Sequence, residues 1–213
     1  KMGLKPVFIE GQRVTDEETM NVVEMVLVGT VNKGIVSLIN KAGGKAVGLS
    51  GRDGNLILAE KMTLYKYTGE DRPPEIIDIG RVGRVKEINP DVLYTLIEKD
   101  FIPVIAPVGV GPDGEAYNIN ADLVAGALAE ALSAEKLIYL SDVEGVKDEE
   151  GKLISTLYVD EIEIFIEKKI VKGGMIPKLK SAKKALLAGV KKAHIIDGRI
   201  THSLIIELFT DEG

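Results

Sequence analysis

Two amides and a carboxylate, Asn118, Asn120 and Asp122, recur at spacing i, i+2, i+4. In an extended segment this spacing places side chains on one face. Asn120 is also suited to cap a helix, and Asp122 falls in the first turn, where negative charge is favoured. The residues that follow, 123–132, are almost wholly apolar and predict a buried helix. A plain cap explains Asn120 alone equally well, but three polar groups beside a buried helix need partners, which favours a binding site.

A second candidate is the stretch 173–178, which reads Gly-Gly-Met-Ile-Pro-Lys. Two glycines let the backbone approach a ligand closely. Pro177 is predicted to be the first residue of a helix continuing over residues 179–188, and free N–H groups at a helix start favour an anion. Lys178 opposes the helix dipole there, which is explained if it serves a phosphate. The alternative is a solvated lysine in a basic run that includes Lys180, Lys183 and Lys184.

Arg13 follows a predicted strand, and an arginine fork binds a carboxylate in a bidentate manner. The alternative is an ordinary surface arginine. Glycine-rich turns also follow predicted strands at 109–111, 142–145 and 173–174. Such turns gather at the ligand edge of a parallel sheet, although each alone is more often only a turn. Neither a P-loop nor a GxGxxG fingerprint is present.

Strands and helices that could position these residues alternate along the chain. Strands are predicted at 7–10, 46–49, 62–67, 76–79, 103–108, 137–140 and 193–196, and helices at 17–41, 90–99, 123–132, 156–168, 179–188 and 203–209. A polar loop at 69–74 should join a hairpin. This alternation predicts an α/β fold, a three-layer αβα sandwich around a largely parallel open sheet. A two-lobe arrangement would divide into 1–132 and 133–213.

Composition narrows the function classes. The chain has 213 residues, 45% of them hydrophobic, with no cysteine, two histidines and a net charge of −6. Disulfides, a thiolate metal site and a histidine zinc site are therefore not expected, and nucleic-acid binding is disfavoured. The absence of cysteine fits a reducing cytoplasm. No uninterrupted apolar run reaches membrane length and no signal peptide is recognised, so no membrane partner is expected. Because residues 5–9 already suggest a strand, we expect a piece of a longer protein.

Five stretches together resemble the amino-acid kinase family, most closely its members that act on an acylated glutamate. They are 11–20, 47–54, 118–122, 140–146 and 173–178, in the family's order. The resemblance covers essentially the whole chain and agrees with the polar face, the cationic helix start and the strand-end turns described above.

The resemblance implies ATP-dependent phosphorylation of the side-chain carboxylate of N-acetyl-L-glutamate, giving the 5-phosphate in arginine biosynthesis. It implies that Arg13, Asn118 and Asn120 bind the substrate in the first lobe. Asp122 would orient catalytic lysines, and Lys178 would stabilise the transferring phosphoryl group. Mg²⁺ would arrive with ATP, held mainly by phosphate oxygens. The implied nucleotide residues of the second lobe are Ser141, Asp142, Val143, Gly145, Val146, Gly173, Gly174 and Met175.

One departure from the family concerns the phosphate clamp. The family begins with a Lys-Gly-Gly strand and a His-Gly-Gly-Gly loop, and neither is present in these 213 residues. Because phosphoryl transfer depends on positioning and charge stabilisation, activity of this stretch alone is expected to suffer severely. Two alternatives stay open. One is an acetylaminoadipate kinase of lysine biosynthesis, although the Gly-x-Arg-Val-Thr form of the substrate loop favours glutamate. The other is a non-catalytic fragment that binds arginine.

Regulation and assembly are also suggested by the resemblance. Residues 202–210 are similar to the C-terminal stretch of arginine-inhibited members, with His202 and Glu207 as candidate regulatory residues. Glu207 would pair with a guanidinium, or would simply lie in solvent on an amphipathic last helix. The helix at 17–41 is apolar over more than one stripe, which predicts a homodimer or higher homo-oligomer.

Overall fold

The computed structural model describes residues 8–9, 12–66 and 75–210. The chain divides into two compact units, Lys1–Val124 and Ala125–Gly213. The division falls within helix α4 (Ala121–Ala131), whereas the division predicted from sequence lies just past the end of this helix. The assignment of one lobe to the acyl amino acid and the other to the nucleotide stays a prediction.

The first unit begins with a short antiparallel pair, β1 (Phe8–Ile9) and β2 (Gln12–Arg13). A long helix follows, made of α1 (Glu17–Glu24), the π-helical segment η1 (Met25–Val31) and α2 (Asn32–Lys41). Asp16 caps it, since its carboxylate accepts a hydrogen bond from Thr19 N at 2.7 Å. The predicted helix at 17–41 is therefore confirmed, with a π-helical middle that periodicity did not predict.

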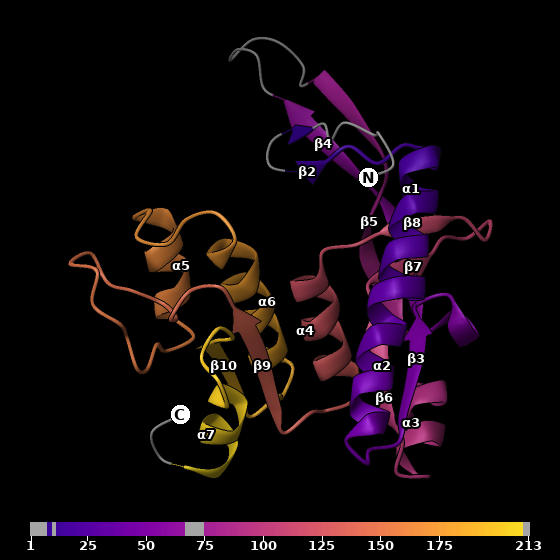
Figure 1. The fold of residues 1–213 in the computed structure, drawn as a ribbon. Helices are drawn as coiled ribbons and strands as arrows, with labels where there is room; N and C mark the ends of the chain where they lie inside the picture. Colours follow the sequence, from indigo (N-terminus) through magenta and orange to yellow (C-terminus); the bar gives the residue numbers. More distant parts are fainter. Residues whose placement is uncertain (1–7, 10–11, 67–74, 211–213) are drawn as a thin grey trace. The chain divides into compact units, whose positions relative to one another are not determined.

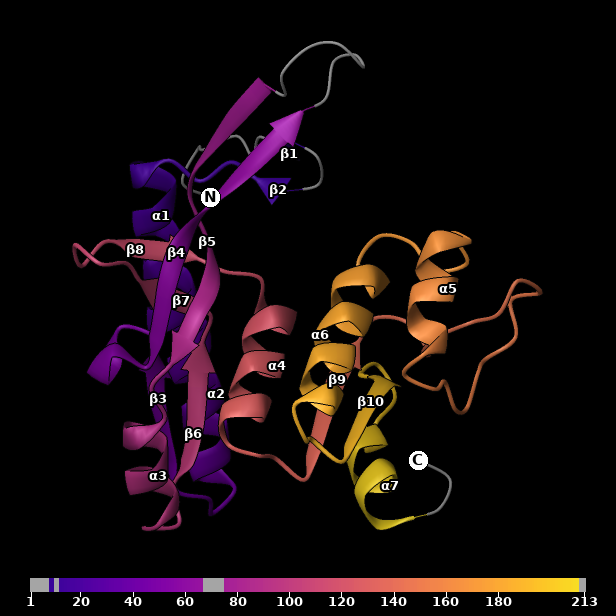
Figure 2. The same ribbon diagram turned by 180° about the vertical axis from the view of Figure 1, so that it is seen from behind.

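A parallel pair of strands, β3 (Ala46–Ser50) and β6 (Ile102–Ala106), lies against this helix, with α3 (Asp91–Ile97) packed on β6 (Figures 1 and 2). Asn32 ties the helix to both strands. Its buried side-chain amide donates to Leu49 O at 3.2 Å and Val104 O at 2.7 Å. A buried amide needs such partners, so this contact determines which face of α2 packs on the strands.

A small closed barrel occupies the rest of the first unit. A short 3₁₀ turn, η2 (Asp53–Asn55), precedes the first barrel strand, β4 (Ile57–Lys66). Strand β4 pairs antiparallel with β5 (Glu75–Ile88). A second antiparallel pair, β7 (Val108–Val110) and β8 (Ala116–Asn118), closes the barrel. The predicted hairpin is confirmed with longer strands, while its predicted loop at 69–74 lies outside the described residues. The barrel and its surroundings bury the largest fully enclosed side chains: Leu56, Ile57, Ile79, Leu93, Val108 and Thr15.

The second unit is built on a parallel pair, β9 (Lys136–Ser141) and β10 (Lys192–Asp197). The helices α5 (Glu161–Glu167) and α6 (Met175–Leu187) lie side by side, and α7 (Ser203–Phe209) follows β10 (Figures 1 and 2). One apolar cluster joins the strands to α6 and the end of α4, and contains Ala129, Leu137, Tyr139, Ala182, Ala185 and Val190. A second cluster, Val146, Ile162, Val171 and Leu179, lies beside α5.

The α/β class is confirmed, with parallel pairs at β3–β6 and β9–β10 and helices packed on them. Three local predictions need correction. The predicted helix at 156–168 is confined to α5. Helix α4 is mostly half-buried rather than buried, with Leu123 37% exposed. Helix α6 begins at Met175, so Pro177 is its third residue rather than its first.

The helix at 17–41 also bears on the membrane prediction. By length and composition alone it could cross a membrane, but Glu24 and Lys33 interrupt its apolar residues, so the predicted absence of an uninterrupted apolar run of membrane length stands. A single helix of this kind is weak evidence for a span. Asn32, in its middle, binds carbonyl groups of two strands of its own unit, which is protein packing. The packing therefore favours a protein partner for the other face.

Candidate functional site

The edge where β9 and β10 end carries the most concentrated chemistry in the second unit. The strands are parallel and in register to their last residues, Ser141 opposite Asp197. Gly198 N donates to Ser141 O at 2.8 Å and continues this register into the turn. The segments leaving both strands therefore emerge together, which is where open parallel sheets bind ligands.

A pocket of about 460 Å³ lies at this edge, and we call it the strand-end pocket. It is lined by Asp142, Val143, Glu144, Gly145, Val146, Lys147, Ile170, Val171, Lys172, Met175 and Arg199. The lining combines an apolar surface with cations and carboxylates. Such a combination can hold a molecule that has both a flat apolar part and charged groups.

Most of the predicted nucleotide residues meet in this pocket: Asp142, Val143, Gly145, Val146 and Met175. Ser141 does not line it and is instead buried at the end of β9. Gly173 and Gly174 are also outside the lining, although their neighbours Lys172 and Met175 belong to it. A Cβ atom added to either glycine would meet nothing within 4 Å, and Gly173 has a φ of +55°. The backbone there is open to close approach.

Ion pairs hold three of the pocket's charged side chains, Glu144, Lys147 and Arg199. Lys147 contacts Glu144 at 2.8 Å, and this hydrogen bond lowers the pKa of Glu144. The Arg199 guanidinium donates to both oxygens of Asp197 from Nε and Nη2, at 2.9 and 2.7 Å. These hydrogen bonds lower the pKa of Asp197 to about 2 and raise the pKa of Arg199. Both partners are therefore charged at neutral pH.

Lys178 lies on α6, one turn from the Gly173–Gly174 turn that opens the helix. Its side chain is half-buried, unlike that of the exposed Lys180. The alternative, a solvated surface lysine, therefore describes Lys180 better than Lys178. Because the helix starts earlier than predicted, the cation stands at the end of the first turn, still within reach of the helix dipole.

The predicted substrate residues belong to the first unit. Asn118 ends β8, opposite Val108 on β7. Asn120 caps α4, since its side-chain oxygen accepts from Asp122 N at 2.9 Å and Leu123 N at 3.2 Å. The cap confirms the prediction for Asn120. The helix already begins at Ala121, however, so Asp122 is not in an extended segment, and strand alternation does not place it on one face with Asn118 and Asn120. Asp122 lies in the first helical turn as predicted. Arg13 ends β2, and its side chain is outside the described part of the chain.

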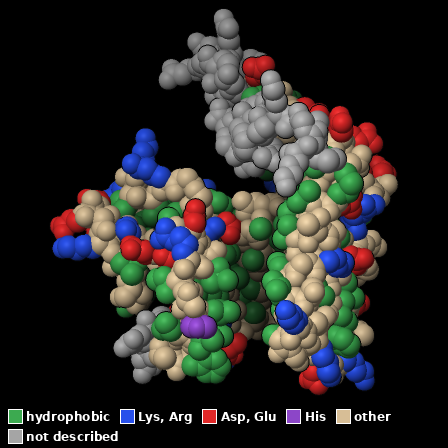
Figure 3. Space-filling model, viewed as in Figure 1, with side chains coloured by type: hydrophobic (Ala, Val, Ile, Leu, Met, Phe, Trp, Pro, Cys, Tyr) green, Lys and Arg blue, Asp and Glu red, His purple; other side chains and the backbone are tan. Residues whose placement is uncertain are grey.

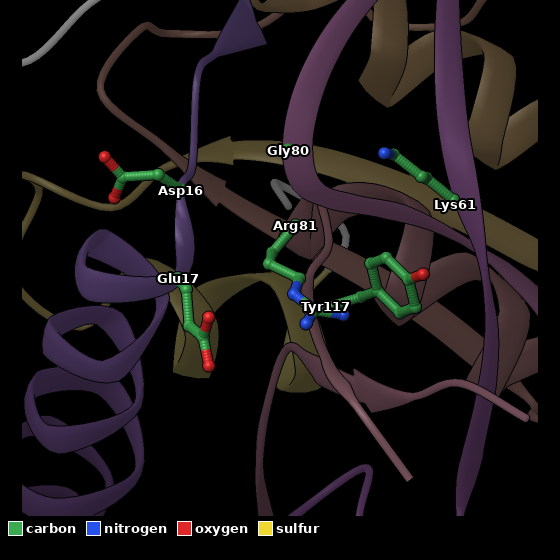
Figure 4. A pocket seen from close by; sticks show the side chains of 6 residues that line it. All are labelled: Asp16, Glu17, Lys61, Gly80, Arg81 and Tyr117. Atoms are coloured by element: carbon green, nitrogen blue, oxygen red, sulfur yellow. The ribbon is translucent and has the colours of Figure 1, made fainter. Parts of the chain in front are cut away.

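A smaller pocket of about 180 Å³ lies in the first unit and is lined by Asp16, Glu17, Lys61, Gly80, Arg81 and Tyr117 (Figure 4). The guanidinium of Arg81 extends beside the Tyr117 ring. Tyr117 is buried and donates its hydroxyl to Glu115 at 3.1 Å, and burial, followed by this hydrogen bond, raises its pKa. Lys61 pairs with Asp78 at 2.8 Å. Sequence reasoning missed this pocket because its residues come from four separate segments.

The two candidate regulatory residues do not meet. Glu207 is buried, with a side chain 2% exposed, and contacts His194 Nδ1 at 2.6 Å and Lys136 Nζ at 3.6 Å. Within the described residues, Glu207 Oε2 and His194 Nε2 have no hydrogen-bond partner. The alternative that Glu207 lies in solvent was therefore wrong. His202 is exposed, with a left-handed φ of 66°, just before α7.

Sequence analysis overlooked several functional candidates that the structure brings to these sites. His194 and Lys136 come from neighbouring strands and surround Glu207. Lys172 and Arg199 join the predicted nucleotide residues. The Asp-Gly-Arg turn directly after the last strand was a usable signal for Arg199, because turns at the ends of parallel strands collect at one edge.

Comparison with known proteins decides the family. Residues 1–197 match the amino acid kinase family. The chain belongs to this family. Along its whole length it is also 60% identical to an acetylglutamate kinase of Syntrophus aciditrophicus and 55% identical to one of Aquifex aeolicus, of which it covers 72% and 73%.

Two solved structures have a fold similar to that of this chain. The protein smu.665 of Streptococcus mutans has a TM-score of 0.77 at 31% identity, covering 91% of this chain and 74% of that one. An N-acetylglutamate synthase of Neisseria gonorrhoeae, complexed with coenzyme A and N-acetyl-glutamate, has a TM-score of 0.81 at 26% identity. That match covers 98% of this chain and 45% of the synthase. This amino acid kinase is thus similar both to kinases and to part of a synthase.

Proposed function

We propose that this protein phosphorylates the side-chain carboxylate of N-acetyl-L-glutamate with ATP, giving N-acetyl-L-glutamyl 5-phosphate and ADP. A carboxylate oxygen attacks the γ-phosphorus, and the bond to the β-phosphate bridging oxygen breaks. The observation that carries the proposal is the 60% identity to an acetylglutamate kinase along the entire chain. The reaction is a step of arginine biosynthesis.

The nucleotide part of the proposal places ATP in the strand-end pocket. Support comes from the meeting there of Asp142, Val143, Gly145, Val146 and Met175, all of them residues that the sequence predicts to bind the nucleotide. Helix α6 begins beside the pocket, and its first N–H groups favour phosphate. Lys178 would stabilise charge on the transferring group. Mg²⁺ would be held mainly by phosphate oxygens, since it keeps few protein ligands.

The substrate part places N-acetyl-L-glutamate in the first unit. Arg13 would fork onto a carboxylate, and Asn118 and Asn120 would offer amide groups. The smaller pocket of the same unit is lined by two cations, Lys61 and Arg81, and two carboxylates, Asp16 and Glu17, so the two cations are the groups in it that would meet a carboxylate of the acceptor. Asp122, in the first turn of α4, would orient the catalytic lysines.

The test is product chemistry, with the protein assayed at the length of its relatives. The protein is incubated with ATP, Mg²⁺ and N-acetyl-L-glutamate in neutral hydroxylamine, which converts an acyl phosphate into a hydroxamate. ADP and hydroxamate should form in equal amounts with this acceptor, and far more slowly with N-acetyl-L-2-aminoadipate. ADP without hydroxamate would show that the acceptor is not a carboxylate, and faster reaction with the aminoadipate would reverse the substrate assignment.

The alternatives raised by the sequence lose support. No observation favours an acetylaminoadipate kinase, and relatives named acetylglutamate kinase match the full chain at high identity. The same relatives make a non-catalytic role for the protein the weaker explanation.

Inhibition by arginine is a further part of the proposal. A buried carboxylate with one unpaired oxygen is costly, and a guanidinium is a suitable donor for it. Glu207 is such a group, with His194 beside it in place of the predicted His202. Arginine would inhibit only if it prefers one of two conformations.

Self-association through the helix at 17–41 completes the proposal. Its exposed apolar side chains are Met25, Val26, Val31, Ile35 and Leu38. Hydrophobic side chains gather along this helix in the face shown in Figure 3. A continuous apolar face of this kind is typical of an interface, and a two-fold dimer would bury it against its own copy.

A further inference from the structure

Arg199 lines the strand-end pocket and has no role in the proposed chemistry. It follows β10 by one turn, and Gly198 N is bonded to Ser141 O at the end of β9. A Cβ atom on Gly198 would stand 3.2 Å from Leu140 Cβ and 3.3 Å from Ser141 O, closer than side chains normally pack. The turn therefore holds close to β9, and Arg199 is presented at the pocket from a rigid strand end.

The orientation of the guanidinium is controlled by Asp197. Nε and Nη2 both donate to this buried carboxylate, and Arg199 N donates to it as well, at 2.9 Å. A bidentate pair of this kind holds the guanidinium plane in one orientation. One edge of the group is consumed by Asp197, yet the side chain is still 62% exposed. The opposite edge of the guanidinium, which carries Nη1, and its two planar faces remain for a ligand.

The surroundings indicate which part of a nucleotide these faces meet. A phosphate placed beside Arg199 would face the carboxylates of Asp142, Glu144 and Asp197, whose charges already act on the guanidinium. An uncharged base would meet no such repulsion. The pocket also supplies an apolar wall suited to a flat ring, formed by Val143, Val146, Ile170, Val171 and Met175. Arginine stacks on aromatic faces through its plane and charge together, which a lysine does not reproduce.

We propose that Arg199 binds the nucleotide by stacking its guanidinium on the base, with Asp197 as the residue that positions it. This inference rests on the proposed function, since it assumes that ATP occupies the strand-end pocket. It assigns the phosphates to Lys172, which also lines the pocket and directly precedes the Gly173–Gly174 turn.

The experiment measures binding of adenosine and of ADP to the same proteins by calorimetry. Arg199→Ala should raise the Kd of both ligands by the same factor, about 3- to 10-fold, as expected for one stacked cation. Arg199→Lys keeps the charge and should recover little of the loss. The control is Arg84→Ala, because Arg84 is similarly exposed, at 67%, and also ion-paired, with Glu60, but lies in the first unit.

The pattern of losses separates the outcomes. Weaker ADP binding with unchanged adenosine binding would mean a phosphate contact and would overturn the proposal, as would full recovery by Arg199→Lys. Equal loss in Arg84→Ala would mean a general effect of removing an ion pair and would also overturn it. If the unmutated protein binds neither ligand, the proposed function itself fails, which is a different result from loss in the variant alone. Thermal unfolding of Arg199→Lys confirms that its binding is measured on folded protein.

Discussion

At the scale of single residues, Lys178 is the side chain on which the proposed chemistry depends most. Its ammonium is predicted to stabilise charge that develops in the transition state, so Lys178→Ala should lower kcat by about 100-fold or more, with a smaller effect on the KM for ATP. Steady-state kinetics at the length of the relatives measures both. Lys180→Ala is the matched control, since Lys180 is exposed on the same helix. A near-normal kcat for Lys178→Ala would contradict the assignment.

A substitution at Arg13 tests the proposed binding of N-acetyl-L-glutamate. Lysine keeps the charge but has no fork, so Arg13→Lys should weaken binding of N-acetyl-L-glutamate while ATP affinity hardly changes. Removing one arm of a charged hydrogen-bonded pair predicts a loss of about 10-fold. Calorimetry with each ligand separately is the measurement. Equal losses for the two ligands would make Arg13 a structural residue.

The lowered pKa of Asp197 predicts how folding stability depends on pH. Its pKa is lowered from 3.8 to about 2 in the folded protein, chiefly by the hydrogen bonds from Arg199. A carboxyl group with a lowered folded pKa contributes stability that is fully present above its unfolded pKa. That contribution is lost as pH falls through the folded pKa. The difference in unfolding free energy between the unmutated protein and Asp197→Asn should therefore be constant above about pH 5 and shrink toward pH 2.

Denaturant titrations at several pH values measure this difference. Asp160→Asn is the control, because Asp160 precedes α5 and makes no side-chain capping hydrogen bond. A difference that stays the same down to pH 2 would show that the Asp197–Arg199 pair contributes nothing to folding stability.

At the scale of elements, the helix at 17–41 is unusual because it packs one face on β3 and β6 and leaves an apolar face exposed. Leu38 is 70% exposed on that face. A charge placed there should oppose burial against a second copy, so Leu38→Glu should shift the protein toward monomer. Light scattering across micromolar concentrations measures the shift.

The control for this variant is Leu187→Glu, which places the same charge at a leucine 71% exposed at the end of α6. Only the Leu38 variant should change the oligomeric state. If both variants behave like the unmutated protein, the helix is not the interface.

At the scale of the whole molecule, arginine inhibition would couple Glu207 to catalysis. Millimolar arginine should slow the unmutated enzyme or raise its KM for N-acetyl-L-glutamate, and Glu207→Gln should abolish this response while keeping the side chain's shape. An activity titration is the measurement, with Glu167→Gln, an exposed residue of α5, as control. No response of the unmutated enzyme to millimolar arginine would remove the regulatory proposal.

Local sequence patterns were sufficient for much of this protein. The alternation of apolar strands with amphipathic helices predicted the α/β class, and nearly every long element was located, because helical and strand periodicities are written in neighbouring residues. The cap at Asn120 followed from residue preference alone. The family resemblance in five short stretches selected residues that later met in one pocket, although it says nothing of how they touch.

Only the tertiary structure decided which residues meet across long separations. Spacing along the chain could not distinguish Glu207 from a solvated glutamate. Its contacts in the fold are with His194 and Lys136, which lie on two neighbouring strands, β10 and β9. Arg199 reached the strand-end pocket because β10 lies parallel to β9, a pairing no local pattern encodes. The early start of α6 likewise depended on packing, since Met175 and Ile176 contact the apolar cluster beside α5. Burial and partnership are properties of the assembled fold, whereas periodicity and capping belong to the chain itself.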